Sequence, residues 1–345
     1  MSFELTFLHD GGQTAESVAE RLRSFIEPAR RSLDVAIYDF KAREGASGSV
    51  AKTLEAAHAR GVTVRVVYTL EPEERERGYP GVRRPPISEP EEIDGLDVPT
   101  RGVRGDGALM HHKYVVRDGE AVLSGSTNWT DDAFSREENV ILEIQSERLA
   151  TAFGANFEQL WTKRKLRSSG GSGRATRIDG TVFRPFFSPK GPSLPHLVAG
   201  FIGEARRRVR ILTPVMTSGA ILGTVAELAG RRSFDFGGAY DLTQMEEVQS
   251  QWTLVPANHW KLDAWKSIAR RLSGKRSTPY SKHALHDYMH AKAIVVDDEV
   301  LTGSYNCSRG GAENAENVLH VRANPLADRF ADFADRIAAR YRDVE

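Results

Sequence analysis

Two stretches of this 345-residue sequence carry the same set of reactive and polar residue types. Residues 110–129, MHHKYVVRDGEAVLSGSTNW, predict a β-hairpin that turns near Asp118-Gly119. Residues 290–306, HAKAIVVDDEVLTGSYN, repeat the pattern at an offset of 179 residues before the turn and 178 after it. The matched residues are His111, Lys113, Ser126 and Asn128 in the first stretch and His290, Lys292, Ser304 and Asn306 in the second. Glu138-Asn139-Val140 and Glu316-Asn317-Val318 follow the two stretches and also match at 178.

Each hairpin predicts a small patch with an imidazole, an ammonium group, a hydroxyl and an amide. Residues two apart on a strand share a face, and the returning strand brings the serine and the asparagine beside the histidine and the lysine. Two such patches facing each other could break a phosphodiester. One imidazole would attack phosphorus to form a phosphohistidine, and the other would protonate the leaving oxygen and then activate water.

The other matched residues have predicted roles in the same reaction. The lysines and asparagines would stabilise the charge on the phosphoryl oxygens, and the two serines would contact the substrate. Glu138 and Glu316 are the matched carboxylates that would orient the imidazoles. This chemistry requires no metal ion and no other cofactor.

The duplication also predicts the architecture. In each half, alternating strands and helices surround the motif hairpin, and a helix follows it at 146–163 and at 327–343. We therefore expect two homologous α/β repeats, each a mixed β-sheet flanked by helices, packed as a pseudo-twofold dimer. The predicted boundaries are 1–166 for the first repeat, 167–177 for a flexible Gly/Ser-rich linker and 178–345 for the second repeat. Because both motifs lie in one chain, the site needs no further oligomer.

Composition limits the classes of function. Lys plus Arg and Asp plus Glu both number 47, so no net charge draws the chain towards polyanions and any anion binding must be local. A single cysteine, Cys307, excludes an intrachain disulfide and a cysteine-based zinc site. The sequence shows neither a basic leader with an apolar run nor an apolar segment of about 18 residues. We therefore expect a cytoplasmic protein without a transmembrane segment.

Two copies of H-x-K-x4-D followed by G-S-x-N resemble the motifs of the phospholipase D superfamily, in its single-chain form with two motifs. The resemblance implies a metal-independent phosphodiesterase with one active site between two phospholipase D-like repeats. It implies that His111 is the nucleophile and His290 the acid and base. It also implies hydrogen bonds across the interface, from His111 to Glu316 and from His290 to Glu138. The motif aspartates, Asp118 and Asp297, would be structural.

The substrate is less clearly indicated. Residues 260–283 hold seven Lys or Arg against one acid, with aromatic residues between them, a composition that suits a nucleic-acid strand. The residues of this stretch predicted to bind substrate are Lys261, Lys266, Arg270, Arg271, Lys275 and Arg276. An exposed basic helix without a ligand would have the same composition.

Three functions follow from these features. The first is a nuclease acting on DNA or RNA. The second is a phospholipase D acting on phospholipid head groups, for which only residues 252–260, WTLVPANHW, offer an apolar rim. The third is a nucleic-acid-binding component of a larger defence or repair assembly. The polar segment 71–95 predicts a surface loop, with an acidic lid over the site as a further hypothesis.

Overall fold

A computed structural model describes residues 2–70, 75–76, 83–84, 90–281 and 284–342. The first half forms a mixed seven-stranded sheet in which β2–β3 and β3–β6 are parallel pairs and the other pairs are antiparallel. In spatial order its strands are β1 (Phe3–Leu8), β9 (Asn139–Gln145), β8 (Ala121–Gly125), β7 (Lys113–Arg117), β2 (Ser32–Ile37), β3 (Thr63–Leu70) and β6 (Thr100–Arg104).

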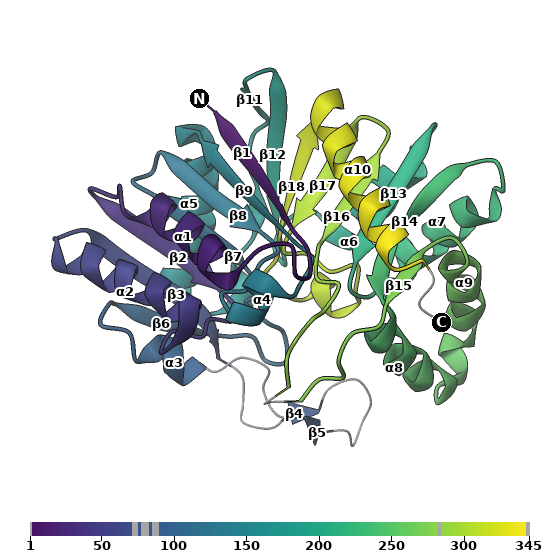
Figure 1. Ribbon diagram of the computed structural model, residues 1–345, viewed down its shortest axis with the longest axis horizontal. Helices are drawn as coiled ribbons and strands as arrows, with labels where there is room; N and C mark the ends of the chain where they lie inside the picture. Colours follow the sequence, from purple (N-terminus) through teal and green to yellow (C-terminus); the bar gives the residue numbers. More distant parts are fainter. Residues whose placement is uncertain (1, 71–74, 77–82, 85–89, 282–283, 343–345) are drawn as a thin grey trace.

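The second half repeats this order, with β12, β18, β17, β16, β13 and β14 in the places of β1, β9, β8, β7, β2 and β3. Its strands are β10 (Gly171–Ser172), β12 (Thr181–Phe187), β18 (Asn317–Arg322), β17 (Glu299–Gly303), β16 (Ala293–Val296), β13 (Arg208–Thr213), β14 (Asp235–Asp241) and β15 (Ser273–Lys275), with β11 (Thr176–Ile178) paired to β12. The two sheets lie side by side (Figure 1). The prediction of two homologous α/β repeats is confirmed.

Helices cover both faces of each sheet. α1 (Ala15–Ile26) and α2 (Gly45–Ala59) share a core with one face of the first sheet, and α6 (Leu194–Gly203) and α7 (Gly219–Gly230) with one face of the second. The opposite faces pack on α5 (Glu147–Lys163) and α10 (Asn324–Arg340), whose apolar side chains share one core that crosses between the halves. The remaining helices are α3 (Pro90–Asp94), α4 (Asp131–Ser135), α8 (Leu242–Thr253) and α9 (His259–Ala269), with short 3-10 turns at Leu166–Ser168, Pro256–Asn258 and Gly310–Ala312.

Aromatic contacts join the halves within that core. The ring of Phe7 on β1 stacks on Phe333 of α10 with 4.3 Å between centroids. Phe153 of α5 meets Phe187 of β12 edge to face at 5.0 Å. Burying such side chains contributes about 1.5–3 kcal/mol each. The relative position of the halves is therefore set by a packed apolar core.

Two parts of the segment 167–177, which was predicted as a flexible linker, belong to the second sheet. Gly171 and Ser172 pair with β12, and Thr176 to Ile178 pair with it further along. A chain rich in glycine and serine is flexible when nothing binds its backbone. Here the edge of the sheet supplies hydrogen-bond partners for the backbone amides. The predicted linker therefore has regular backbone partners at 171–172 and 176–177.

The predicted loop at 71–95 falls partly outside the described residues, which omit 71–74, 77–82 and 85–89. Two short strands, Arg75–Glu76 and Arg83–Arg84, pair with each other. Residues 90–94 form α3, whose Ile93 is fully buried. The end of the segment therefore belongs to the first core.

The motif aspartates fix the hairpins to the sheets. Asp118 has a left-handed backbone (φ 55°), and its carboxylate accepts hydrogen bonds from the backbone N–H groups of Arg31 (2.7 Å) and Ser32 (2.9 Å). Asp297 (φ 52°) does the same in the second half, with the N–H groups of 206–208. Each carboxylate therefore fixes the hairpin turn to the start of the neighbouring strand, β2 in the first half and β13 in the second. These turns lie at the opposite end of each hairpin from its motif histidine.

Candidate active site

The two motif histidines line one cleft of about 860 Å³ between the halves, together with Asn128 and Asn306. Each histidine lies just before its hairpin strand, β7 or β16. The backbone there pairs with the other half, because Met110 forms a bridge with Ala315. The equivalent bridge joins Met289 to residue 138. The pseudo-twofold relation therefore brings the two imidazoles together, as the duplication predicted.

A carboxylate from the second half holds His111. The Nδ1 atom of His111 lies 3.0 Å from Oε2 of Glu316, the contact that the family resemblance implied. Ser304 Oγ donates to the same oxygen (2.6 Å), and Asn314 Nδ2 donates to Oε1 (3.2 Å). Burial opposes ionisation of Glu316, but its interactions with His111, Lys113 and Ser304 hold its pKa below the usual value.

The resulting charge state suits a nucleophile. Burial lowers the pKa of His111 to about 4, although Glu316 acts in the opposite direction. At neutral pH the imidazole is thus uncharged. Because Nδ1–H donates to the carboxylate of Glu316, the lone pair is on Nε2. Tyr38 packs against the imidazole with 4.8 Å between ring centroids.

The predicted contact between His290 and Glu138 is wrong. The Nδ1 atom of His290 lies 3.1 Å from Oδ1 of Asn139 and 3.2 Å from Oε2 of Glu137. Ser126 Oγ donates to the same Asn139 oxygen at 2.7 Å. Asn139 therefore contacts His290 as Glu316 contacts His111, and Glu137 is an additional carboxyl group that the sequence analysis missed.

Strand register explains the difference. Gly125 pairs with Ile141, whereas Gly303 pairs with Val318. Ile141 and Val318 are thus structural equivalents, which makes Asn139 the equivalent of Glu316. A shift of one residue moves a side chain to the other face of a strand, so matching Glu-Asn-Val by sequence assigned the wrong carboxylate. The sequence offsets gave no direct signal for Glu137, because Glu137 and Glu316 are not equivalent positions in the two sheets.

Glu137 and His290 are both uncharged at neutral pH. Burial raises the pKa of Glu137 to about 8, and the opposing effect of Lys292 and Asn139 is smaller. Burial, together with Lys292 and Lys113, lowers the pKa of His290 well below its usual value. A protonated carboxyl group therefore lies beside Nδ1 of His290, on the cleft lining. If it donates to Nδ1, the Nε2 atom of His290 carries a proton that a leaving group can accept.

Glu138 serves a different purpose. Its carboxylate accepts from Lys275 Nζ (2.9 Å) and from the hydroxyl of Tyr341 (2.6 Å), and Asp10 Oδ2 lies 3.4 Å from the same ammonium group. This buried cluster joins the first half to β15 and to the end of α10. Glu138 and Lys275 thus contribute to the interface between the halves, and neither lines the cleft for which a catalytic role of Glu138 and a substrate role of Lys275 were predicted.

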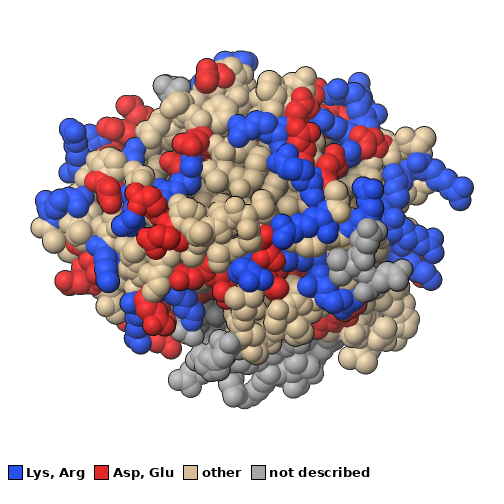
Figure 2. All heavy atoms as spheres, viewed as in Figure 1, with Lys and Arg blue, Asp and Glu red and all other residues tan. Residues whose placement is uncertain are grey.

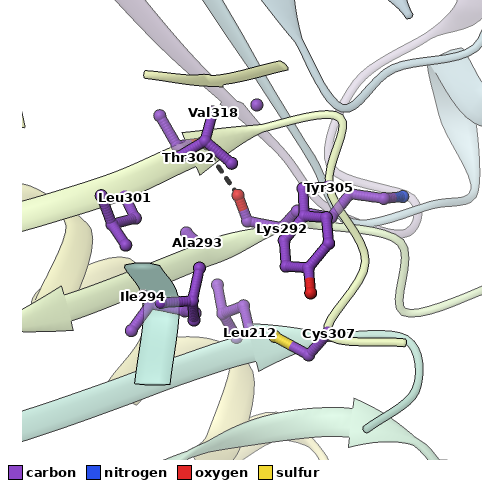
Figure 3. A pocket seen from close by; sticks show the side chains of 11 residues that line it. Leu212, Lys292, Ala293, Ile294, Leu301, Thr302, Tyr305, Cys307 and Val318 are labelled. Carbon is purple, nitrogen blue, oxygen red and sulfur yellow. Dashed lines mark hydrogen bonds between the residues drawn. The ribbon is translucent and has the colours of Figure 1, made fainter. Parts of the chain in front are cut away.

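The motif lysines lie next to the histidines but beneath the cleft surface. Lys113 Nζ donates to the backbone oxygen of His111 (2.8 Å), and Lys292 Nζ donates to that of His290 (2.6 Å). Burial lowers the pKa of Lys113 to about 7 and that of Lys292 well below its usual value. An anion bound above them would favour their charged forms. Figure 3 shows the side chain of Lys292 passing Tyr305, in a small apolar cavity that also contains the buried Cys307.

The two asparagines and the two serines divide their roles. Asn128 and Asn306 line the cleft, and the Oδ1 atoms of both have no hydrogen-bond partner among the described residues. A phosphoryl oxygen needs a donor, and the Nδ2 groups of these two amides on the cleft lining could supply one. Ser126 and Ser304 are fully buried, and each Oγ accepts from a backbone N–H, of Val140 or of Asn317. The serines thus bond to the neighbouring strands, and neither of them lines the cleft where they were predicted to contact substrate.

One helix and one loop form much of the rest of the cleft; the sequence analysis did not place the helix there, and of the loop's rings only Tyr280 belongs to the stretch 260–283. α8 presents Gln244, Val248 and Gln251, at helical spacing, to the cleft. The loop between β15 and β16 adds three rings that stack in sequence, with centroids 5.3 and 5.4 Å apart: Tyr280, His286 and Tyr288. Asp241 caps α8 through the N–H of Gln244 (2.9 Å) and also accepts from the N–H of Met289 (3.0 Å), which connects this wall to the histidine motif.

The predicted basic groove is not found. None of the six cationic residues lines the cleft within the described part of the chain. Arg271 donates to the backbone oxygens of Ala229 and Phe234, and Arg276 pairs with Glu246. The other three, Lys261, Lys266 and Arg270, lie on α9 or directly after it. His283, part of a histidine run in the second half, lies outside the described residues, which include no cluster of three or more His, Cys, Asp or Glu placed to hold a metal ion.

The fold and the paired motifs define a member of the phospholipase D superfamily. The chain belongs to the family described as "Cardiolipin synthase, PLD-like domain", whose model matches residues 22–161 and 198–338. The family match thus covers most of both repeats.

Individual relatives are more distant. The mitochondrial cardiolipin hydrolase of Xenopus laevis is 32% identical over 146 residues, which are 42% of this chain and 62% of that protein. Phosphatidylserine synthase of Haemophilus influenzae has a similar fold over 97% of this chain and 86% of its own, with a TM-score of 0.66 and 12% identity. Polyphosphate kinase of Porphyromonas gingivalis matches over 97% of this chain and 46% of its own, with a TM-score of 0.61 and 12% identity.

Proposed function

We propose that the chain is a phosphodiesterase that needs no metal ion and that its substrate is a phospholipid. One observation carries the chemistry. Two uncharged imidazoles line one cleft, and each Nδ1 contacts the other half, at Glu316 for His111 and at Glu137 and Asn139 for His290. These contacts hold Nδ1 and leave Nε2 of each ring for the substrate.

The proposed reaction has two steps. In the first, Nε2 of His111 attacks phosphorus, an N–P bond forms and the P–O bond to the leaving alcohol breaks. The leaving oxygen takes the proton from Nε2 of His290, and His290 recovers a proton at Nδ1 from Glu137, which lies 3.2 Å away. In the second step, water attacks phosphorus and the N–P bond breaks, while Nε2 of His290 accepts the proton of the water and Nδ1 returns a proton to Glu137. The amides of Asn128 and Asn306 stabilise the phosphoryl oxygens in both steps.

The walls of the cleft support a phospholipid. An extended nucleic-acid strand binds chiefly through cations that follow its phosphates. Among the described residues the cleft lining includes neither Lys nor Arg, and part of it is apolar, with Pro214, Val215 and Val248. The curated relatives named mitochondrial cardiolipin hydrolase support the same class of substrate, although the matched part covers 62% or less of each protein.

Nuclease activity is the second candidate, because the stacked rings of Tyr280, His286 and Tyr288 offer a surface for nucleic-acid bases. The test incubates the purified chain, in EDTA, with cardiolipin or phosphatidylcholine vesicles and with single-stranded DNA. Release of a lipid head group that disappears in His111→Ala supports the proposal, and cleavage of DNA without lipid hydrolysis contradicts it. Binding of DNA without turnover of either substrate would instead favour the nucleic-acid-binding component.

A phosphoryl adduct trapped by acid quench and located by mass spectrometry tests the chemistry separately. We expect it on His111. An adduct on His290 alone, or turnover that persists in His111→Ala, would contradict the assignment of the nucleophile.

A further inference from the structure

The exposed large apolar side chains of the described residues lie in two segments that border the cleft. They are Leu254 (73% exposed), Trp260 (48%), Leu285 (42%) and Tyr280 (37%), here called the apolar rim. Leu254 follows α8, which lines the cleft as far as Gln251, and Trp260 lies in the first turn of α9. The other two lie in the loop between β15 and β16, where Tyr280 lines the cleft itself. In Figure 1, α8 and this loop extend to the same lower side of the molecule.

This exposure is not a gap in the core. Trp252 and Trp265 are buried beneath the corner where α8 meets α9, so the core there is already filled. Single exposed apolar residues are common on protein surfaces, but a group around the entrance of one cleft is typical of an interaction site. Tryptophan in particular is favoured where an apolar phase meets water, because its ring is apolar and its N–H is polar.

Cationic residues accompany the rim. Lys261 Nζ lies over the rings of Trp252 and Trp260, 5.6 and 6.0 Å from their centroids. Burial and the nearby Arg309 guanidinium lower the pKa of Lys261, so the two cations lie within electrostatic range of each other. Exposed Lys266 and Arg270 extend the cationic surface along α9, where Asp263 is the acid. Figure 2 shows Lys and Arg side chains gathered over this end of the second half.

We propose that the apolar rim docks on an anionic phospholipid bilayer, with Leu254 and Trp260 inserted among the lipids and the cations of α9 against their head groups. Apolar side chains flanked by Lys and Arg are the combination that holds proteins at the surface of anionic membranes. Docking there would place the entrance of the cleft against the head groups, the bonds that a phospholipid phosphodiesterase must reach. The inference rests on the proposed phospholipid substrate, but it can be tested without turnover.

The binding test uses the full chain with His111→Asn, so that the vesicles stay intact. Sedimentation with phosphatidylglycerol/phosphatidylcholine vesicles should recover the protein, and pure phosphatidylcholine should recover at least tenfold less. Adding Leu254→Ser and Trp260→Ser should lower the partition coefficient on anionic vesicles at least tenfold. Unchanged sedimentation of that rim variant would overturn the proposal.

The charged part of the rim has a matched control. Lys266→Gln with Arg270→Gln should weaken binding to anionic vesicles several-fold. Lys52→Gln with Arg148→Gln removes the same charges from exposed positions on α2 and α5 in the first half and should leave binding unchanged. Equal losses in the two pairs would show a nonspecific charge effect and would count against the proposal.

Two further readouts separate docking from other causes. With His111 restored, the rim variant should hydrolyse a soluble diester, bis(p-nitrophenyl) phosphate, within twofold of the parent rate and vesicle lipid at least tenfold more slowly. Equal losses on both substrates would overturn the docking role. If the rim variant no longer binds vesicles and the parent protein hydrolyses no lipid, the docking proposal is supported and the proposed phospholipid substrate is contradicted. A parent dimer that the rim substitutions dissociate in sedimentation velocity would assign the rim to a second copy instead.

Discussion

Replacing Glu137 by glutamine tests whether the additional carboxyl group supplies a proton. In the structure this group lies 3.2 Å from Nδ1 of His290, and burial raises its pKa to about 8. At pH 7 about nine-tenths of the molecules would therefore carry the proton. Glutamine preserves the shape of the side chain but has no proton to transfer. The substitution should consequently affect only the step in which His290 protonates the leaving group.

The size of the effect depends on the leaving group. General acid catalysis contributes about 10²–10⁴-fold in rate, so Glu137→Gln should slow hydrolysis of an alkyl diester about a hundredfold. A p-nitrophenyl diester releases a stable anion that needs little protonation, and its rate should change by less than about threefold. The rate on the p-nitrophenyl diester, measured with the same preparation of the variant, is thus the control for the rate on the alkyl diester.

The pH dependence gives a second readout. Because Glu137 acts in its protonated form, activity on the alkyl diester should fall as pH rises through about 8. In Glu137→Gln this alkaline fall should disappear, and only the slow rate should remain. Equal slowing of the alkyl and p-nitrophenyl diesters, or an unchanged alkaline limb, would refute the role as a proton donor and leave Glu137 as a structural residue.

Four other outcomes are expected. Glu316→Gln should slow the alkyl and the p-nitrophenyl diester alike, about tenfold to a hundredfold, because it removes one charge-assisted hydrogen bond of about 1.5–3 kcal/mol from His111; a loss confined to the alkyl diester would contradict this. Lys275→Met should destabilise the fold by about 3–5 kcal/mol, since it leaves the buried Glu138 without its cation, and an unchanged urea midpoint would be inconsistent with the buried ion pair. Asp118→Ala should lower the free energy of unfolding by about 1–2 kcal/mol, because the carboxylate accepts hydrogen bonds only from backbone amides. The activity per folded molecule should stay the same. Calorimetry measures the stability, and active-site titration measures the activity per folded molecule. EDTA should leave the turnover number unchanged, and a loss restored by a divalent cation would argue against the two-histidine mechanism.

The sequence alone was sufficient to predict the repeat and most of the residues that meet in the cleft. The spacing of His111, Lys113 and Asn128, repeated at His290, Lys292 and Asn306, predicted two equivalent hairpins and one shared site. It also predicted the contact between His111 and Glu316, through the resemblance to a known family. These predictions worked because strand periodicity and a duplicated motif are local properties, and a pseudo-twofold axis places equivalent residues opposite each other.

Features that depend on packing between the halves were not accessible in the same way. The sequence match assigned Glu138 to His290, but the register of β9 places Asn139 and Glu137 there and leaves Glu138 against Lys275. Register is fixed by pairing across the sheet, and a one-residue difference in the turn before a strand leaves no clear trace in composition.

The basic stretch shows the same limit. The composition of residues 260–283 gave the number of cationic side chains but not whether they point into the cleft. The wall of the cleft is instead formed by α8 and by the loop that carries Tyr280, His286 and Tyr288. Lys275 is buried in an ion pair, and Arg271 binds backbone oxygens. The sequence thus predicted which reactive groups meet in one cleft, because that depends on residue types and their spacing. Only the tertiary structure decided which carboxyl group serves which histidine and what surrounds the substrate, because those depend on contacts between residues that lie far apart in the chain.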